Sequence, residues 1–461
     1  MENRIIDNKI INNKIMDNKA FYKMAFALVM PMALQNLINV GITSIDVLML
    51  GKVSETVLSA ASLAGQVQFI MMLIFFGLTS GAAVLTAQYW GKGDTKCIEK
   101  IMGICMRFSL LVAIFFTTVV LLFPTQAMNI FTSEAPVIAE GVKYLRIIAM
   151  SYVLMSITMI YLNVMRSVER VIVSTVVYLV SLIINVIVAA ILIFGLFGFP
   201  KLGIQGAAIA TLVSRVVELI SVFIYAKKYN NVIHFKFSNL FVRDKYLFKD
   251  FLTYSIPVTL NELMWGTGVA MNAVVIGHLG SSVVSANSVT QITRQLATVI
   301  AFGLANATAI IVGKAIGENN FEAAKNYSKR FIKLSIIAGV AGAIVILIVR
   351  PILMSTLNLS PVTQGYLSIM MFVMSYFVIA QALNTTLIVG VFRGGGDTKF
   401  GLFLDVSTMW GCSILIGWLA AFVFKWSVPV VYIILMSDEI IKIPLTAWRY
   451  KSKKWLNNVT R

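Results

Sequence analysis

Long runs of apolar residues recur along the whole chain, separated by short polar segments. A helix needs about 20 mostly apolar residues to cross a hydrocarbon core about 30 Å thick, whereas a tilted strand of a membrane barrel needs about 9–11. The runs are too long for such strands, and backbone groups cannot stay unpaired in lipid. The pattern therefore predicts twelve transmembrane helices, near 22–50, 57–88, 108–123, 136–163, 171–197, 204–226, 248–276, 282–313, 332–350, 361–391, 400–424 and 427–448.

The composition supports this assignment. Of 461 residues, 59% are hydrophobic and 13% are charged, with a mean hydropathy of +0.86, whereas a soluble domain averages about 25% charged residues. These values exclude a soluble globular enzyme. The first run is too long for a cleavable signal peptide. Residues 5–19 before it repeat a five-residue pattern that fits neither helix nor strand, so we expect a solvated or membrane-surface tail there.

The net charge of +18 is explained by topology. With an even number of helices, both termini lie on one side of the membrane. The loops and tails on that side carry 30 Lys and Arg residues, Arg393 and Lys442 among them, against 4 on the other side. Because positive loops stay cytoplasmic, we expect a multi-pass protein of the cytoplasmic (inner) membrane with both termini cytoplasmic. Nucleic acid is not needed to explain the charge.

The chain contains an internal repeat. At an offset of 226 residues, Pro31–Gly91 aligns with Pro257–Gly317 without a gap, and 14 of the 61 positions are identical. The matched positions include both prolines and the glycine pair Gly91 and Gly317. Arg166 meets Arg393 at an offset of 227. Duplicated halves of equal orientation are typical of many secondary transporters, whose binding site lies between the halves near the middle of the bilayer.

The repeat predicts the fold class and the domains. We expect an all-α polytopic membrane protein, with two lobes of six transmembrane helices related by a pseudo-twofold axis along the membrane normal. The expected parts are a cytoplasmic tail (1–20), an N-lobe (21–228), a cytoplasmic linker (229–247), a C-lobe (248–450) and a second cytoplasmic tail (451–461).

A polar stripe marks the opening helix of each half. In the first half, Asn36, Asn39, Thr43 and Asp46 fall within an arc of about 80° on a helix of 3.6 residues per turn, with Gln35 at its edge. Polar and ionisable groups in a span are costly and point to function. We therefore expect this face to look onto a wet cavity or the other half.

The second half repeats the stripe with different residues. Glu262 aligns with Asn36, and Asn272 aligns with Asp46, so each half carries one acid at a different depth. Asn261 adjoins Glu262, and Trp265 shares its face as a candidate wall for cations. Two non-equivalent acids suit two tasks, one for a coupling ion and one for a cationic substrate. The alternative is that each acid is packed against a structural partner.

Other ionisable residues lie within the predicted spans. Asp405 is a third candidate acid, and we expect Arg294 to pair with Glu262 or Asp405 because an unpaired cation there is expensive. Two clusters can satisfy themselves locally at helical spacing and are interpreted as structural: Arg215 with Glu218, and Asp438 and Glu439 with Lys442. No nucleotide-binding loop, zinc-protease, esterase or paired CxxC motif occurs in the sequence.

Four stretches of the chain, taken in order, resemble the multidrug and toxic compound extrusion (MATE) transporters. They are Asp46–Gly51, Gly91–Thr95, Phe194–Thr211 and Val391–Thr398. With the two-lobed plan, the resemblance spans residues 21–450. It implies antiport, in which Na⁺ or H⁺ enters as drugs or metabolites leave. It implies no cofactor or resident metal beyond the coupling ion.

The resemblance also implies coupling residues. In one branch of the family, an acid on the first helix works with an Asn and, four residues later, an Asp on the fifth. Here Asp46 and Asn185 match, but Ala189 replaces the Asp. Other branches use an acid in the seventh helix, and Glu262 is similar in role. We therefore expect coupling to depend mainly on Glu262, with Asp46 retained.

The leading hypothesis is an efflux antiporter that acts as a monomer in membrane lipids on cationic or amphiphilic small molecules. A flippase for a lipid-linked precursor and a membrane enzyme or scaffold are the alternatives; no convergent catalytic set supports an enzyme. The expected cation-coupling residues are Asp46, Asn185 and Glu262. The expected substrate cavity is lined by Gln35, Asn36, Asn39, Thr43, Asn261, Trp265, Asn272, Arg294 and Asp405.

Overall fold

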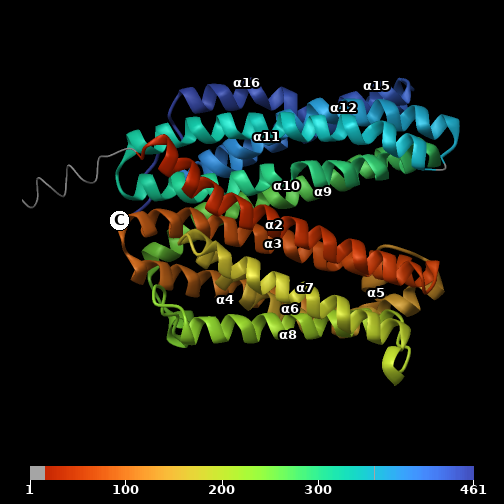
Figure 1. The fold of residues 1–461 in the computed structure, drawn as a ribbon, viewed down its shortest axis with the longest axis horizontal. Coiled ribbons are helices and arrows are strands. Elements are labelled where there is room, and N and C mark those ends of the chain that lie inside the picture. Colours follow the sequence, from red (N-terminus) through yellow and green to blue (C-terminus); the bar gives the residue numbers. More distant parts are fainter. Residues whose placement is uncertain (1–15, 358) are drawn as a thin grey trace, which may run out of the picture. The chain divides into compact units, whose positions relative to one another are not determined.

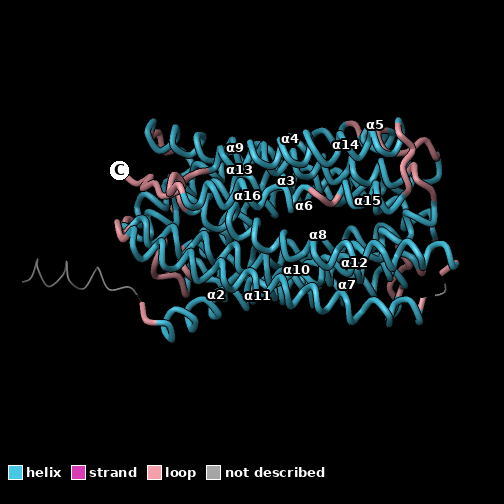
Figure 2. The backbone as a smooth tube through the Cα atoms, turned by 90° about the horizontal axis from the view of Figure 1, so that it is seen from above, coloured by secondary structure: helices cyan, strands magenta, loops and turns pink. Residues whose placement is uncertain are grey.

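The fold is entirely helical over the residues that the structure describes. The computed structural model describes residues 16–357 and 359–461, and short loops join the helices throughout this part of the chain (Figure 2). The prediction of an all-α membrane protein is confirmed. Most of the expected tail, residues 1–15, lies outside the described residues.

The α-helices carry the labels of Figures 1 and 2. They are α2 (Asn18–Gly51), α3 (Glu55–Lys92), α4 (Thr95–Leu122), α5 (Pro124–Asn129), α6 (Ala135–Ser167), α7 (Val171–Phe194), α8 (Ile204–Lys228), α9 (Lys245–Gly277), α10 (Ser281–Gly317), α11 (Phe321–Thr356), α12 (Pro361–Thr385), α13 (Thr398–Asp405), α14 (Leu415–Trp418), α15 (Val428–Leu435) and α16 (Asp438–Lys451). Shorter helical stretches are the 3₁₀ helices η1 (Leu196–Gly198) and η2 (Phe237–Phe241) and the π-helices η3 (Thr386–Phe392), η4 (Val406–Ile414) and η5 (Leu419–Val423).

The helices follow the predicted spans. Ten helices of the described chain are long and apolar enough to cross a membrane. The seventh run lies on α9, which is 33 residues long but is not among the ten. α9 is long enough to cross a membrane, but the polar residues of the second stripe lower its mean hydropathy.

The twelfth predicted span is divided into two helices. α15 ends at Leu435, and α16 begins at Asp438 after a turn in which the N–H of Ser437 donates to the carbonyl of Ile434 (3.1 Å). The first turn of α16 contains Asp438 and Glu439, and carboxylates interact favourably with the dipole at a helix N-terminus. The break therefore places two acids at a helix start in the middle of the predicted span.

The π-helices lie next to candidate site residues. η3 ends at Phe392, one residue before Arg393, and η4 begins directly after Asp405. Short π-helical stretches inside longer helices are uncommon and are frequently found at functional sites. The wider helical turns change the direction in which the flanking side chains point.

Equivalent polar caps begin two helices of the repeat. The Asp94 carboxylate accepts a hydrogen bond from the N–H of Cys97 (3.0 Å) at the start of α4. The Asn320 side chain accepts one from the N–H of Ala323 (3.0 Å) at the start of α11. Such caps stabilise helix N-termini. Asp94 and Asn320 are equivalent at the repeat offset, so the same local signal starts both helices.

The described chain forms two compact units. Unit 1 comprises the described residues up to Ala33, then Ala83–Gly93 and Ile256–Arg461, and unit 2 comprises Leu34–Ala82 and Asp94–Ser255. Consequently α2 and α9, which open the two halves of the repeat, each begin in one unit and end in the other. The expected lobe boundaries at 21–228 and 248–450 stay a prediction.

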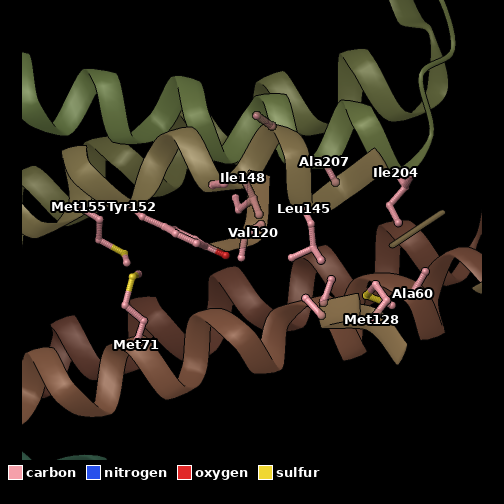
Figure 3. Close-up of a cluster of buried hydrophobic side chains, with 14 of the residues drawn as sticks. Ala60, Met71, Val120, Met128, Leu145, Ile148, Tyr152, Met155, Ile204 and Ala207 are labelled. Atoms are coloured by element: carbon pink, nitrogen blue, oxygen red, sulfur yellow. The ribbon is translucent and has the colours of Figure 1, made fainter. Parts of the chain in front are cut away.

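An apolar core holds unit 2 together. In Figure 3, Met71 of α3 and Met155 of α6 point toward each other beside the ring of Tyr152. Leu145, also on α6, is fully buried in the same cluster. Burial of such side chains contributes about 1.5–3 kcal/mol each in transfer terms. Methionine fills irregular gaps between helices because its side chain is unbranched and flexible.

Unit 1 has a separate apolar core in which α10, α11 and α12 pack against one another. It is built around fully buried residues of α12 such as Met371 and Met374. At one end of this unit, α3 and α10 approach backbone to backbone. A Cβ on Gly91 would meet the carbonyl oxygen of Lys314, and a Cβ on Gly317 would meet that of Gln88. Both residues of each contact are exchanged by the repeat offset, so the contact is reciprocal.

Candidate ion and substrate sites

Gln35 fastens α2 to α7 within unit 2. Its side chain is buried, and Nε2 donates to Ser174 Oγ (2.9 Å) and Thr175 Oγ1 (2.7 Å). Its Oε1 atom is enclosed with no hydrogen-bond partner among the described residues. Gln35 therefore joins two helices, and its role in a substrate cavity stays a prediction.

The rest of the first stripe is less enclosed. Asn36 is half-buried, and its Nδ2 atom lacks a hydrogen-bond partner in the described part of the chain. Asn39 is exposed. The side chain of Thr43 lies outside the described residues. A wet face along α2 remains the prediction for these positions.

Asp46 lies within electrostatic reach of a buried ion pair on α8. The charged group that acts on it is Arg215, and Tyr144 of α6 is close enough to interact with both. Arg215 Nη1 lies 2.6 Å from Glu218 Oε1, and the Glu218 side chain is 1% exposed. The expected local pair of Arg215 and Glu218 is confirmed, and its arginine also acts electrostatically on the candidate coupling acid Asp46.

Asn185 has one side-chain atom without a hydrogen-bond partner among the described residues, whereas Ala189 has apolar surroundings. Asn185 Nδ2 donates to Thr211 Oγ1 on α8 (3.4 Å), and its Oδ1 atom is buried without a described partner. Ala189 is fully buried in the apolar core of unit 2. The position that carries an Asp in one branch of the resembling family is therefore a packing position in this chain.

Glu262 forms an ion pair within unit 1. Its Oε1 atom lies 2.9 Å from Nη1 of Arg393, which follows η3, and the two side chains are 20% and 7% exposed. The pair joins α9 to the end of α12–η3. The acid is thus half-buried and bonded to Arg393, not to Arg294 as expected from the sequence.

The other residues of the second stripe lie along α9 before and after Glu262. Asn261 is buried and Asn272 is half-buried, and the Oδ1 atom of each has no hydrogen-bond partner among the described residues. Trp265 is half-buried. Trp410 of η4 donates its indole N–H to the carbonyl of Met264 (3.0 Å), which fixes η4 against α9.

Lys442 lies among three carboxylates. Its Nζ atom is 2.8 Å from Asp405, 3.1 Å from Asp438 and 3.1 Å from Glu439. Asn384 of α12 donates to Glu439 Oε2 (2.8 Å). We name Asp405, Asp438, Glu439 and Lys442 the Lys442 cluster. The local pairing expected within α16 is confirmed, but the cluster also includes Asp405 from α13.

The expected pairing of Arg294 with Glu262 or Asp405 is wrong. Arg294 donates from Nε to Gln291 (2.8 Å) and from Nη1 to Gln381 (3.5 Å). Both acids have other partners: Glu262 pairs with Arg393 after η3, and Asp405 pairs with Lys442 on α16. Neutral amides and the more distant charges of Asp438 and Glu439 compensate the guanidinium instead.

Sequence reasoning missed Arg393 and Lys442 as site residues. The sequence places Arg393 in a loop and pairs Lys442 only within its own helix, yet the two residues are 6% and 2% exposed and lie in ion pairs with Glu262 and Asp405. The repeat contained a signal for Arg393, since it aligns with Arg166, whose charge faces Tyr178 inside unit 2. Nothing in the sequence around Lys442 links it to Asp405.

Comparison with known proteins identifies both halves of the repeat. A MatE family model matches residues 31–191 and again 257–419, which together exceed half of the chain. The two matches begin at Pro31 and Pro257, the residues at which the sequence repeat begins. The internal duplication is therefore confirmed.

Relatives and solved structures agree over nearly the full length. The uncharacterized transporter YisQ of Bacillus subtilis is 20% identical over 94% of both chains. The probable multidrug resistance protein NorM of Rhizobium meliloti is 26% identical over 87% of both. A crystal structure of MATE in the bent conformation matches with a TM-score of 0.84 at 18% identity, covering 94% of this chain and 96% of the other. A MOP superfamily transporter from Pyrococcus furiosus gives 0.83 at the same identity and coverage.

Proposed function

Because the chain belongs to the MATE family of membrane transporters, which are not enzymes, we propose that it is a cation-coupled antiporter. Entry of H⁺ or Na⁺ drives the export of organic cations, drugs or metabolites across the cytoplasmic membrane by alternating access. Both termini lie in the cytoplasm, as the distribution of Lys and Arg favours.

One observation carries this proposal. In each unit, an acid from a helix that opens a repeat half interacts with an arginine: Asp46 lies within electrostatic range of Arg215 in unit 2, and Glu262 pairs with Arg393 in unit 1. Intramembrane acids matched to specific partners are expensive and mark ion pathways. The repeat thus supplies the same kind of switch twice, with different residues.

The switch works through charge. When H⁺ or Na⁺ binds Glu262, Arg393 loses its counter-charge, and the contact between α9 and the end of η3 weakens. When the ion binds Asp46, Arg215 keeps its pair with Glu218 but no longer attracts α2. An ion can shift the balance between two conformations only by its difference in affinity for them. The acids supply that difference if their arginine partners are closer in one state than in the other.

Several features favour cationic or amphiphilic substrates. The stripe on α9 offers amide oxygens without described partners on Asn261 and Asn272, and Trp265 adds an aromatic face for a cation. Relatives named as multidrug resistance proteins support drugs as substrates. We expect a monomer to carry out transport in the lipid bilayer.

Transport in proteoliposomes tests the proposal. The purified chain is reconstituted, a pH or a Na⁺ gradient is imposed separately, and movement of ethidium is followed by fluorescence. At least one gradient is expected to drive the dye, and Glu262→Gln and Asp46→Asn are each expected to slow it strongly. Glu322→Gln is the matched control, because that carboxylate is 76% exposed and bonded only across one helical turn.

Two outcomes would contradict the proposal at different levels. Wild-type rates in both acid variants would remove the assigned coupling residues but leave the antiporter. Absence of gradient-driven movement of any cationic dye, together with scrambling of a labelled lipid-linked glycan by the same preparation, would instead establish the flippase alternative.

A further inference from the structure

The segment after α16 returns to unit 1 and packs against it. Trp455 is 1% exposed, its ring stacks on Tyr450 with centroids 5.7 Å apart, and its indole N–H donates to the Tyr450 carbonyl (3.1 Å). The carbonyl of Trp455 lies where a Cβ on Gly395 would stand, so only glycine fits there. We name residues 452–461 the strap. Trp455 is its anchor.

The turn under the anchor is itself fixed to α16. Arg449 Nε lies 2.6 Å from Asp397 Oδ2, and the Arg449 guanidinium stacks over the ring of Phe400 at 4.7 Å. The Asp397 side chain is 7% exposed. The stretch Val391–Thr398, one of the four that carry the family resemblance, is therefore the platform on which the strap lies.

Gln88 connects the strap to α3. This side chain is fully buried, and its Nε2 atom donates to the carbonyls of Gly394 (2.9 Å) and Asn457 (3.1 Å). Its Oε1 atom accepts from the N–H of Val459 (2.8 Å). One amide thus satisfies groups on the platform and on two strap residues at once.

The strap also reaches α10. Asn458 Nδ2 donates to the carbonyl of Ile316 (3.2 Å) and to Asn319 Oδ1 (2.6 Å). The strap N–H of Arg461 donates to the Tyr89 hydroxyl on α3 (3.4 Å). The strap therefore binds the ends of α3 and α10 together, at the reciprocal glycine contact between Gly91 and Gly317.

These contacts form two groups with different consequences. The anchor at Trp455 contacts α16 and the platform, so it can stay in place whatever α3 does. Asn457 contacts both sides, because its N–H donates to the Gly395 carbonyl of the platform (3.1 Å) and its carbonyl accepts from Gln88 of α3. The contacts from Asn458 onward bind α3 and the end of α10, and those to one of the two helices must break if these ends separate. Loss of one buried hydrogen bond shifts such an equilibrium by about fivefold, and by more if a buried group is left unpaired.

We propose that the strap is a latch: residues 457–461 hold the α3–α10 contact closed and set how often these helix ends separate, while Trp455 keeps the released segment nearby. The latch rests on the proposed function only in assuming that the two ends separate during transport. Local opening of this kind needs a segment with few apolar contacts, and beyond Trp455 the strap buries only Val459 among its large apolar residues.

Cysteine labelling tests the latch without requiring transport. Ala87 is 1% exposed on α3 and faces Gly313 of α10, so Ala87→Cys reports on separation of the contact. Cys97 and Cys412 are replaced by Ser, and Cys105, buried in unit 2, is kept as an internal reporter of global unfolding. The protein is labelled with maleimide in detergent, and the two sites are quantified separately by mass spectrometry.

Val459→Pro removes the N–H that bonds to Gln88, and Trp455→Ala removes the anchor. Each is expected to accelerate labelling at position 87 by about fivefold or more, which corresponds to the loss of one buried hydrogen bond or more. Labelling of Cys105 is expected to stay unchanged. Lys454→Ala, an exposed position in the same segment, is the matched control and should not change either rate.

The outcomes separate the latch from a merely stabilising segment. Equal labelling at position 87 in the starting protein, Val459→Pro and Trp455→Ala would overturn the proposal. Parallel acceleration at Cys105 would also overturn it, since the strap would then support the whole fold. Faster labelling at position 87 without faster labelling at Cys105 supports the latch even if ethidium transport fails. The test of the latch is therefore independent of the transport assay.

Discussion

The carboxylate of Glu262 lies 2.9 Å from the guanidinium of Arg393, across the contact between α9 and the end of η3. The acid comes from the polar stripe and the arginine from a motif 131 positions later in the chain. Because the π-helical stretch ends one residue before Arg393, the wide turn and the ion pair occur at the same place. A change in the charge of Glu262 is therefore expected to act at the end of η3.

A double-mutant cycle measures this relationship. Glu262→Gln and Arg393→Gln are each expected to destabilise the protein, the arginine variant by about 3 kcal/mol, since breaking a buried pair leaves a charge without its partner. The double variant should recover part of that loss. Thermal unfolding in detergent gives the coupling free energy, and a value near zero would mean that the pair contributes nothing to the fold.

Substitution of Arg215 is expected to destabilise the protein more than substitution of Asp46, because Arg215 is the cation paired with the buried Glu218. Arg215→Gln leaves Glu218 buried without its cation and is expected to cost about 3–5 kcal/mol of stability. Arg215→Lys keeps the charge and should lose less. Melting temperatures of the two variants check this, and equal losses would show that charge at Arg215 does not matter.

Removal of the positive charge from the Lys442 cluster is expected to destabilise the protein far more than removal of one of its negative charges. Three carboxylates surround one ammonium, so Lys442→Met leaves like charges together and should destabilise by about 3–5 kcal/mol. Asp438→Asn removes one excess negative charge and should cost far less. A melting temperature that falls as much in Asp438→Asn as in Lys442→Met would contradict this account.

Ala189→Asp is expected to damage the fold rather than restore an ion site. Position 189 is fully buried in the apolar core of unit 2, where an unpaired carboxylate costs several kcal/mol. Ala189→Asn is the neutral isosteric control and should be less destabilising at neutral pH. Increased Na⁺-driven dye transport in Ala189→Asp, without loss of thermal stability, would contradict the packing role.

The sequence alone determined the helices, the duplication and the identity of the opening acids. Hydropathy is a local property, so the apolar runs specify spans whatever their partners are. The matched prolines and glycines reveal the repeat because the local backbone conformation or close packing requires these residue types in both halves. The caps at Asp94 and Asn320 are local in the same sense. Asp46 and Glu262 could be found because an acid in an apolar run is conspicuous.

Only the tertiary structure decided which charges meet. In the sequence Arg393 looks like a loop cation and Lys442 like a cation paired only within its own helix, and their burial depends on how helices rotate and pack around them. The predicted partner of Arg294 is wrong for the same reason, since a helix presents only part of its surface to each neighbour. The contact of the strap with Gln88 joins residues 371 positions apart. Such contacts are set by the packing of distant segments, which no local pattern encodes.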